Sequence, residues 1–150
     1  LDTLKAIEKL LNKPLKVKKE IPIIGTGTNP ELIEKLLAKQ RIDLESILPK
    51  SPLLQKQIIH LQAKYGLEAL NVVKRNEENE LTPLSEIIPL CKAEIVEDIC
   101  HEHAKTATDI LARRSRLAMI DMAEAERILP IVQEQLIKNN LPASEINLEK

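Results

Sequence analysis

The chain has 150 residues and a formal net charge of −1 at pH 7, and 43% of its residues are hydrophobic. It contains no Trp, no Phe, one Tyr and three Gly, so any core is aliphatic and the tight turns of a β-sandwich or barrel are excluded. The near-zero charge excludes a global basic field that would hold nucleic acid or an anionic membrane. The abundance of Leu, Glu, Lys and Arg predicts an all-α fold, a compact bundle of about five to six helices with an extended N-terminal linker segment.

The two cysteines, Cys91 and Cys100, are too few for a disulfide scaffold and indicate a reducing, cytoplasmic compartment. The sequence has no signal peptide and no apolar run of about 18 residues, which predicts no transmembrane span. Because the chain starts at Leu1 in what reads as a helix, we expect it to be a fragment of a longer protein.

In chain order, the first predicted helix carries Leu4, Ile7, Leu10 and Leu11 on one face and ends at Pro14. Residues 13–29 hold two of the three glycines and predict an extended linker. The alternative for this stretch, a dinucleotide-binding loop, lacks its third glycine because Pro30 stands there.

Two cap-then-proline signatures predict the next helices. Asn29–Pro30 begins one that runs to about Lys39, and a turn-like segment over 41–50 follows it. Ser51–Pro52 begins another, which Gly66 ends, and residues 67–75 form two further turns.

The 40 residues between Pro89 and Pro130 contain neither Gly nor Pro. From Lys92 the apolar stripe predicts one long helix, or two coaxial pieces with a break near Thr106 and Thr108. Asp121 and Glu124 form a capping-box pattern that begins the last helix, in which Pro130 should produce a kink. Residues 142–150 are expected to be a frayed tail.

Few residues in the sequence suggest a metal-binding or catalytic site. A metal hypothesis rests on Cys91, Glu97, Cys100, His101 and His103, but their spacing brings no three or four ligands together on one helical face. A core cysteine and solvated histidines are therefore the preferred interpretation. No nucleophile–base set or paired-carboxylate cleft can be placed, so we predict no catalytic, cofactor-binding or metal-binding residue in this chain.

A compact basic cluster follows Asp109. Asp109 and Arg113 have the i, i+4 spacing of a helical ion pair. Arg114 lies within the apolar stripe and should pair with a carboxylate or backbone carbonyls, because burying a lone guanidinium is costly. Buried or interfacial anchoring is favoured over a solvated face and over phosphate binding. Nucleic-acid binding is disfavoured, because no aromatic residue that could stack on a base lies near this cluster in the sequence.

The same region carries a family resemblance. The block Asp109–Leu117, preceded by Glu102, Ala104 and Thr106, resembles the C-terminal helical domain of FAD-dependent glycerol-3-phosphate dehydrogenases and α-glycerophosphate oxidases. Further matches cover about residues 53–140. They are Tyr65–Gly66 (with Lys64 in place of the family's Arg), Ala93–Glu94–Ile95, Ala123–Glu124–Ala125 and Leu129–Pro130–Ile131–Val132.

The resemblance implies three regions: residues 1–28, the end of a flavin-domain helix plus linker; 29–141, a C-terminal helical cap domain; and 142–150, a tail. It implies a parent enzyme that oxidises sn-glycerol 3-phosphate to dihydroxyacetone phosphate with FAD and passes electrons to quinone or oxygen. The fragment itself would be inactive and free of cofactor. Its partner would be the N-terminal flavin and substrate domain of the same chain, with a homo-oligomer as a further expectation. The parent would be cytoplasmic, touching the membrane only peripherally.

Asp109, Arg113, Arg114 and Arg116 are the residues expected to dock the cap on that catalytic part. Two other interpretations stay open. One is a free-standing helical adaptor whose aliphatic faces bind partner helices, and the other is an independent small enzyme.

Overall fold

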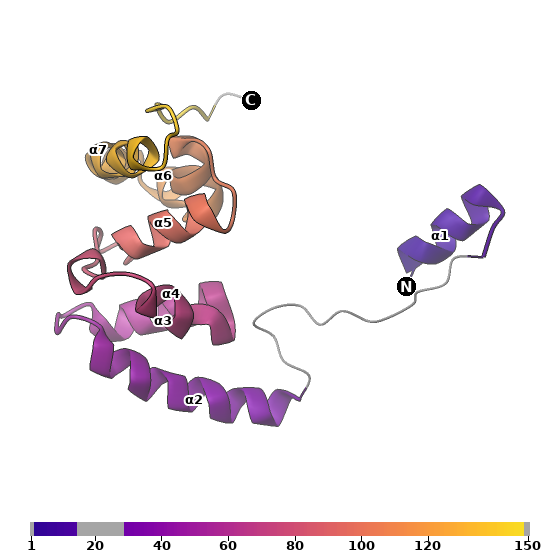
Figure 1. Cartoon of the computed structure of the whole chain (residues 1–150), viewed down its shortest axis with the longest axis horizontal. Helices are drawn as coiled ribbons and strands as arrows, with labels where there is room; N and C mark the ends of the chain where they lie inside the picture. Colours follow the sequence, from indigo (N-terminus) through magenta and orange to yellow (C-terminus); the bar gives the residue numbers. More distant parts are fainter. Residues whose placement is uncertain (1, 15–28, 149–150) are drawn as a thin grey trace.

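The computed structural model describes residues 2–14 and 29–148 (Figure 1). Its seven α-helices, with no strand among the described residues, confirm the all-α prediction, and five of them have seven residues or more. The helices are α1 (Asp2–Leu11), α2 (Pro30–Ile47), α3 (Leu54–Tyr65), α4 (Ala69–Lys74), α5 (Lys92–Cys100), α6 (Leu117–Ile120) and α7 (Met122–Lys138). Short turns η1 (Gly66–Glu68), η2 (Glu78–Glu80) and η3 (Asp109–Arg114) complete the order. Of the linker predicted over 13–29, residues 15–28, with both glycines, lie outside the described residues.

Helix α2 begins as predicted, because the Asn29 side chain accepts hydrogen bonds from the backbone of Glu31 (3.0 Å) and Leu32 (3.3 Å). Its predicted end at Lys39 is wrong, and so is the turn over 41–50, because the helix continues to Ile47. Tertiary packing extends it. Gln40 is buried and donates to the Leu67 carbonyl oxygen at 2.8 Å, and Leu44 is completely buried against the neighbouring helices.

Helix α3 ends at Gly66, as predicted. Gly66 has φ 56° and ψ −129°, a conformation that is open to glycine and costly for a residue with a Cβ atom. The chain then turns through η1 directly into α4, which is the pair of turns expected over 67–75.

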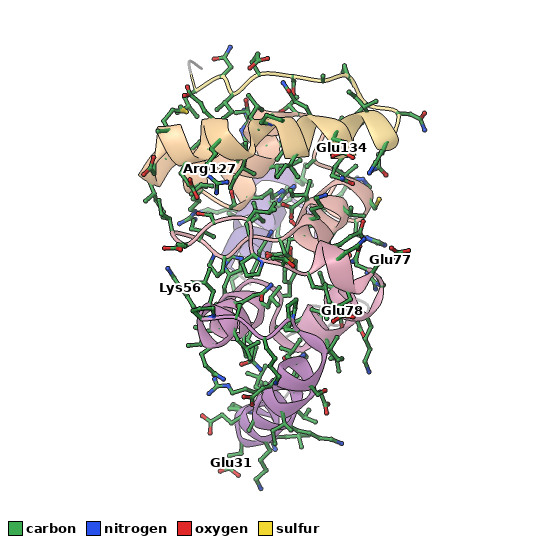
Figure 2. The ribbon with its side chains drawn as sticks, turned by 90° about the vertical axis from the view of Figure 1, so that its left-hand side faces the viewer. Glu31, Lys56, Glu77, Glu78, Arg127 and Glu134 are labelled. Carbon is green, nitrogen blue, oxygen red and sulfur yellow. The ribbon has the colours of Figure 1, made fainter. Side chains whose placement is uncertain are left out.

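The buried apolar residues form two clusters, stacked along the molecule as α2–α4 and α5–α7 in Figure 1. Helix α5 serves both, with Ala93 in the first cluster and Ile95 and Ile99 in the second. In Figure 2, Glu31 and Glu134 mark the opposite ends of this stack, on α2 and α7. The fold is thus two aliphatic layers that share one helix.

The continuous helix predicted from Lys92 is wrong, and its alternative, two coaxial pieces with a break near Thr106 and Thr108, is right only in its first break, because the chain divides into α5, η3 and α6. His103 (φ 58°) and Arg116 (φ 62°) adopt left-handed backbone conformations that an α-helix cannot include. The first break, over residues 101–106, reaches the position predicted at Thr106, and the second, at 115–116, was not predicted; η3 lies between them as a turn of π-helix.

Helix α7 is capped as predicted, since Asp121 accepts a hydrogen bond from the Glu124 backbone at 2.9 Å. It continues through Pro130 to Lys138. The frayed tail is wrong for residues 142–148: this segment has no regular secondary structure, but it is hydrogen-bonded to the body. Ser144 accepts from the Ala107 backbone (2.8 Å), and the Asn147 backbone donates to Thr108 (2.8 Å).

Candidate functional site

The predicted docking residues lie on η3 and the turn that follows it, and a local cap positions the first of them. Thr106 and Asp109 bond reciprocally: the Asp109 carboxylate accepts from the Thr106 backbone (3.0 Å) and hydroxyl (2.9 Å), and the Asp109 backbone donates back to the Thr106 hydroxyl oxygen (3.1 Å). This is the geometry of a capping box. The pattern Thr-x-x-Asp marks this helix start in the sequence and agrees with the break predicted near Thr106.

The ion pair predicted between Asp109 and Arg113 is present, with Arg113 Nη1 2.6 Å from Asp109 Oδ1. Burial raises the pKa of Asp109. The hydrogen bonds from the Lys105 backbone, from Thr106 and from Arg113 outweigh that effect, and the pKa lies below its usual value. The Asp109 carboxylate therefore caps the start of η3 and orients the Arg113 side chain.

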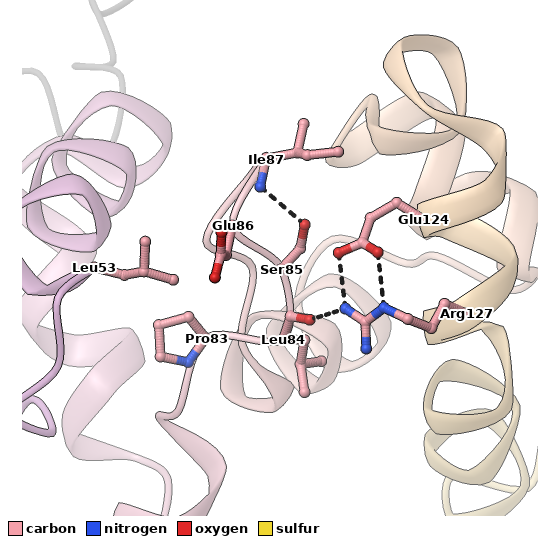
Figure 3. A pocket seen from close by; sticks show the side chains of 8 residues that line it. All are labelled: Leu53, Pro83, Leu84, Ser85, Glu86, Ile87, Glu124 and Arg127. Atoms are coloured by element: carbon pink, nitrogen blue, oxygen red, sulfur yellow. Dashed lines mark hydrogen bonds and ion pairs between the residues drawn. The ribbon is translucent and has the colours of Figure 1, made fainter.

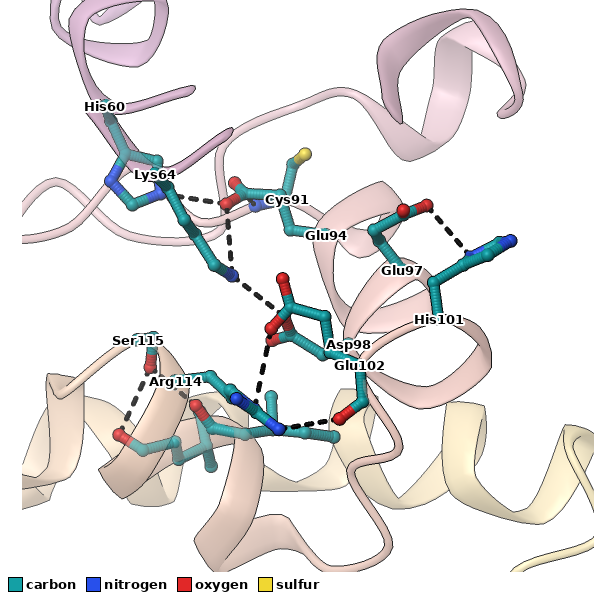
Figure 4. Close-up of polar contacts among 12 residues, drawn as sticks. His60, Lys64, Cys91, Glu94, Glu97, Asp98, His101, Glu102, Arg114 and Ser115 are labelled. Atoms are coloured by element: carbon teal, nitrogen blue, oxygen red, sulfur yellow. Dashed lines mark hydrogen bonds and ion pairs between the residues drawn. The ribbon is translucent and has the colours of Figure 1, made fainter. Parts of the chain in front are cut away.

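Arg114 pairs with a carboxylate and a backbone carbonyl, as predicted, but its side chain is 41% exposed and not buried. Its guanidinium donates to the Glu102 backbone oxygen at 2.6 Å and faces the Glu102 carboxylate at 3.5 Å (Figure 4). Arg114 thus ties η3 to the loop after α5, and it acts within the domain.

Arg113 and Arg116 lie together at a different place. They line a hollow of about 520 Å³, together with Thr108, Ala112, Met119, Asn147 and Leu148. We call it the arginine hollow. Asn147 and Leu148 of the C-terminal segment form one wall, and residues of η3, Arg116 and α6 form the rest. Of the four predicted residues, the structure therefore brings Asp109, Arg113 and Arg116 to one surface and directs Arg114 elsewhere.

A second polar group, missed by the sequence analysis, lies between α3 and α5. Glu94 and Asp98 are completely buried, and Lys64 spans them at 3.7 and 2.9 Å (Figure 4). His60 lies 2.9 Å from Glu94, whose other oxygen accepts from the Cys91 backbone at 3.2 Å. We call these four side chains, His60, Lys64, Glu94 and Asp98, the buried ionic cluster.

The surroundings of this cluster shift its pKa values. Burial raises the pKa of Asp98 to about 6, against the opposing effect of Lys64. Burial, and then the charges of Glu94 and Asp98, raise the pKa of Tyr65. The second carboxylate oxygen of Asp98 and the Tyr65 hydroxyl are both buried without a hydrogen-bond partner among the described residues.

The cluster joins the two apolar layers. His60 and Lys64 lie on α3, in the first layer, and Glu94 and Asp98 lie on α5, which packs into both layers. Its signal in the sequence was the pair of i, i+4 spacings, His60–Lys64 and Glu94–Asp98. The spacing alone does not reveal that the two pairs face each other, which depends on how α3 packs on α5.

A further hollow, of about 530 Å³, lies between the loop over 83–87 and α7 (Figure 3). Arg127 bonds both oxygens of Glu124 at 2.7 Å and donates to the Leu84 carbonyl oxygen. The hydrogen bonds from Arg127 and Ser85 lower the pKa of Glu124 to about 2. Arg127, Glu124 and the Leu84 carbonyl oxygen bond one another here, and these contacts hold α7 to the loop.

No group of three or more metal-ligating side chains occurs in the described parts of the chain. His101 instead faces Glu97 at 3.2 Å, the i, i+4 pair noted in the sequence. Within the same residues, none of the helices has the length and apolar character that crossing a bilayer requires.

Comparison with known proteins identifies the domain. Residues 17–142 match the family described as the C-terminal domain of alpha-glycerophosphate oxidase. A probable mitochondrial glycerol-3-phosphate dehydrogenase of Dictyostelium discoideum is 40% identical over 115 residues, which are 76% of this chain and 16% of that protein. No solved structure matches the chain. The helical fold and the block Asp109–Leu117 fit the same assignment, and the chain belongs to the family of C-terminal domains of alpha-glycerophosphate oxidases.

Proposed function

We propose that this chain is the non-catalytic C-terminal cap of a longer, FAD-dependent glycerol-3-phosphate dehydrogenase. The parent would oxidise sn-glycerol 3-phosphate to dihydroxyacetone phosphate and pass the electrons to quinone or oxygen. The observation that carries the proposal is the family match over residues 17–142, together with a relative of which this chain spans 16%. The remaining length of such a parent would supply the redox chemistry.

The described residues support a role without cofactor. A dinucleotide is held where a glycine-rich turn joins a strand to a helix. Residues 2–14 and 29–148 contain no strand and form no such unit, so they do not fit FAD. In the parent, FAD would supply hydride acceptance, and this domain would supply a rigid helical surface packed against the flavin and substrate domain.

The residues proposed for docking are Asp109, Arg113 and Arg116, with Arg114 supporting them from within the domain. Asp109 orients Arg113, and Arg113 and Arg116 share the exposed arginine hollow. We extend the proposal to a cytoplasmic parent that touches the membrane only peripherally and that forms homo-oligomers.

The test compares the 150-residue chain with the longer polypeptide encoded by the same gene. We expect the chain to be colourless and to leave glycerol 3-phosphate unchanged, and the longer polypeptide to show a flavin absorption band that glycerol 3-phosphate bleaches. Flavin binding or turnover by the chain alone would contradict the non-catalytic role. A longer polypeptide without either property would contradict the proposed activity.

Exposed apolar positions on the N-terminal helices favour a second candidate, a helical adaptor. Ile7, Leu10 and Leu11 on α1 and Leu32 and Leu36 on α2 are exposed, and such faces bind partner helices. A gene that encodes only this chain would support the adaptor over the cap.

A further inference from the structure

Arg116 differs from its neighbouring arginines in the ion pairs that its side chain makes with the described residues. Arg113 pairs with Asp109, and Arg114 pairs with Glu102. For the exposed Arg116 guanidinium, residues 2–14 and 29–148 provide no ion pair. An uncompensated cation therefore lines the arginine hollow.

The backbone of Arg116 is also unusual. Its φ of 62° places it in the left-handed region, where glycine is free of strain and other residues are disfavoured. Such outliers cluster at binding and functional sites, where the side chain compensates for the cost of the conformation. In this conformation the Arg116 carbonyl oxygen accepts a hydrogen bond from the Met119 backbone at 3.1 Å at the start of α6, and the side chain stays exposed.

Apolar side chains stand beside this cation. Met119, which lines the arginine hollow, is 71% exposed, and the next residue, Ile120, is 64% exposed. The cores of protein interfaces are enriched in Met and Arg, and adjacent exposed apolar side chains mark contact surfaces. The exposed side chains of the corner from Arg116 to Ile120 have this composition. The other two residues of the corner, Leu117 and Ala118, are buried in the second apolar cluster.

We propose that the arginine hollow receives an acidic segment from the N-terminal part of the longer polypeptide. A carboxylate pairs with Arg116, and an apolar neighbour on the same segment packs on Met119. A carboxylate matches the planar fork of a guanidinium, and the adjoining apolar wall suits a peptide side chain. This inference rests on the proposed function, because the family relative is several times longer than this chain and this chain spans 16% of it.

The test measures amide hydrogen exchange at residues 116–120 in two proteins, the 150-residue chain and the longer polypeptide. We expect exchange to be at least about tenfold slower in the longer polypeptide, because docking covers this corner. In the longer polypeptide, Arg116→Ala and Met119→Gln should each restore faster exchange. Equal exchange in both proteins, or protection that survives Arg116→Ala, overturns the proposal.

Matched controls separate docking from general effects. Lys74→Ala removes an exposed cation on α4, and Ile59→Gln changes an exposed apolar residue on α3; both should keep the protection. In the 150-residue chain, Arg116→Ala should leave the thermal midpoint unchanged, since no ion pair joins this side chain to residues 2–14 or 29–148. A chain that unfolds on this substitution also overturns the proposal, because the side chain would then be structural.

The readouts distinguish this inference from the proposed function. A flavin-containing longer polypeptide that oxidises glycerol 3-phosphate without protecting residues 116–120 overturns the docking site alone. A protected corner in a colourless, inactive polypeptide supports the docking site and contradicts the redox function. Protection that rises with the concentration of the 150-residue chain identifies a second copy as the occupant, and it overturns the proposal as stated.

Discussion

Asp98 is a carboxylic acid enclosed between two helices, and its two oxygens have different surroundings. One accepts a hydrogen bond from Lys64 at 2.9 Å, and the other is buried without a partner among the described residues. The unpartnered oxygen can carry a proton at little cost, whereas full ionisation leaves it unsolvated. This asymmetry accounts for a pKa raised to about 6 by burial.

We therefore predict that Asp98 makes the domain less stable as pH rises from about 4 to 6. In this window the folded state holds a proton that the unfolded state has released, so stability falls with rising pH, by a total of the order of 1 to 3 kcal/mol. Asp98→Asn should flatten this part of the profile in urea titrations at successive pH values. An unchanged slope in the variant would show that Asp98 is not the group responsible.

The pKa of Asp109 is shifted in the opposite direction to that of Asp98, because the surroundings of Asp109 stabilise its charged form. Asp109→Ala removes a cap with two backbone donors and the partner of Arg113, and it should cost about 1 to 2 kcal/mol of unfolding free energy at pH 7. The folded pKa is lowered, so the difference from wild type should shrink as pH falls below the usual aspartate pKa. Glu134→Gln, which breaks an exposed pair with Lys138, is the matched control and should leave the unfolding free energy close to that of wild type.

At the scale of elements, the ends of helices were predicted well where a single residue determines them. Asn29, Gly66 and Asp121 act at the expected places, because capping depends on local backbone geometry. The C-terminal end of α2 was predicted poorly, because its last turns are stabilised by Leu44 packing on distant helices.

Gly66 provides the element-scale prediction. Gly66→Ala should destabilise the domain by about 1 to 3 kcal/mol, since φ 56° with ψ −129° places a Cβ atom in a disfavoured region. The measurement is the midpoint of chemical unfolding. A variant as stable as wild type would mean that α3 can end without this conformation.

The interruptions between α5 and α6 were predicted only in part, because the apolar spacing continues across them. Ala107, Ile110 and Leu111 keep a helical period and are buried, but they sit on a segment that restarts after His103. Periodicity reports which residues face a core, and it does not report whether the axis is continuous. The Thr106–Asp109 cap was the local sign of the restart.

For the whole molecule, the two apolar clusters are joined by α5 and by the buried ionic cluster. Because one helix packs into both layers, we predict that they unfold together. Leu61→Ala, which removes a completely buried side chain of the first cluster, should cost about 2 to 5 kcal/mol and accelerate amide exchange in α7 as much as in α3. Ile59→Ala, an exposed change on the same helix, should leave both rates near those of wild type.

Faster exchange confined to α2–α4 in Leu61→Ala would contradict this coupling. It would mean that the layer of α5–α7 holds its structure alone and that the ionic contacts between the layers contribute little.

The sequence by itself determined the helical class, the caps, the Asp109–Arg113 pair and the family, because each depends on composition or on residues within a few positions of one another. Only the tertiary structure decided three other features: the pairing of Lys64 with Asp98, the ordering of residues 142–148 against Ala107 and Thr108, and the separation of Arg114 from Arg116. These contacts join residues that are far apart in the chain, or they depend on a left-handed turn at Arg116. The direction in which a helix leaves such a turn is set by the packing of the whole domain, and spacing along the sequence carries no record of it.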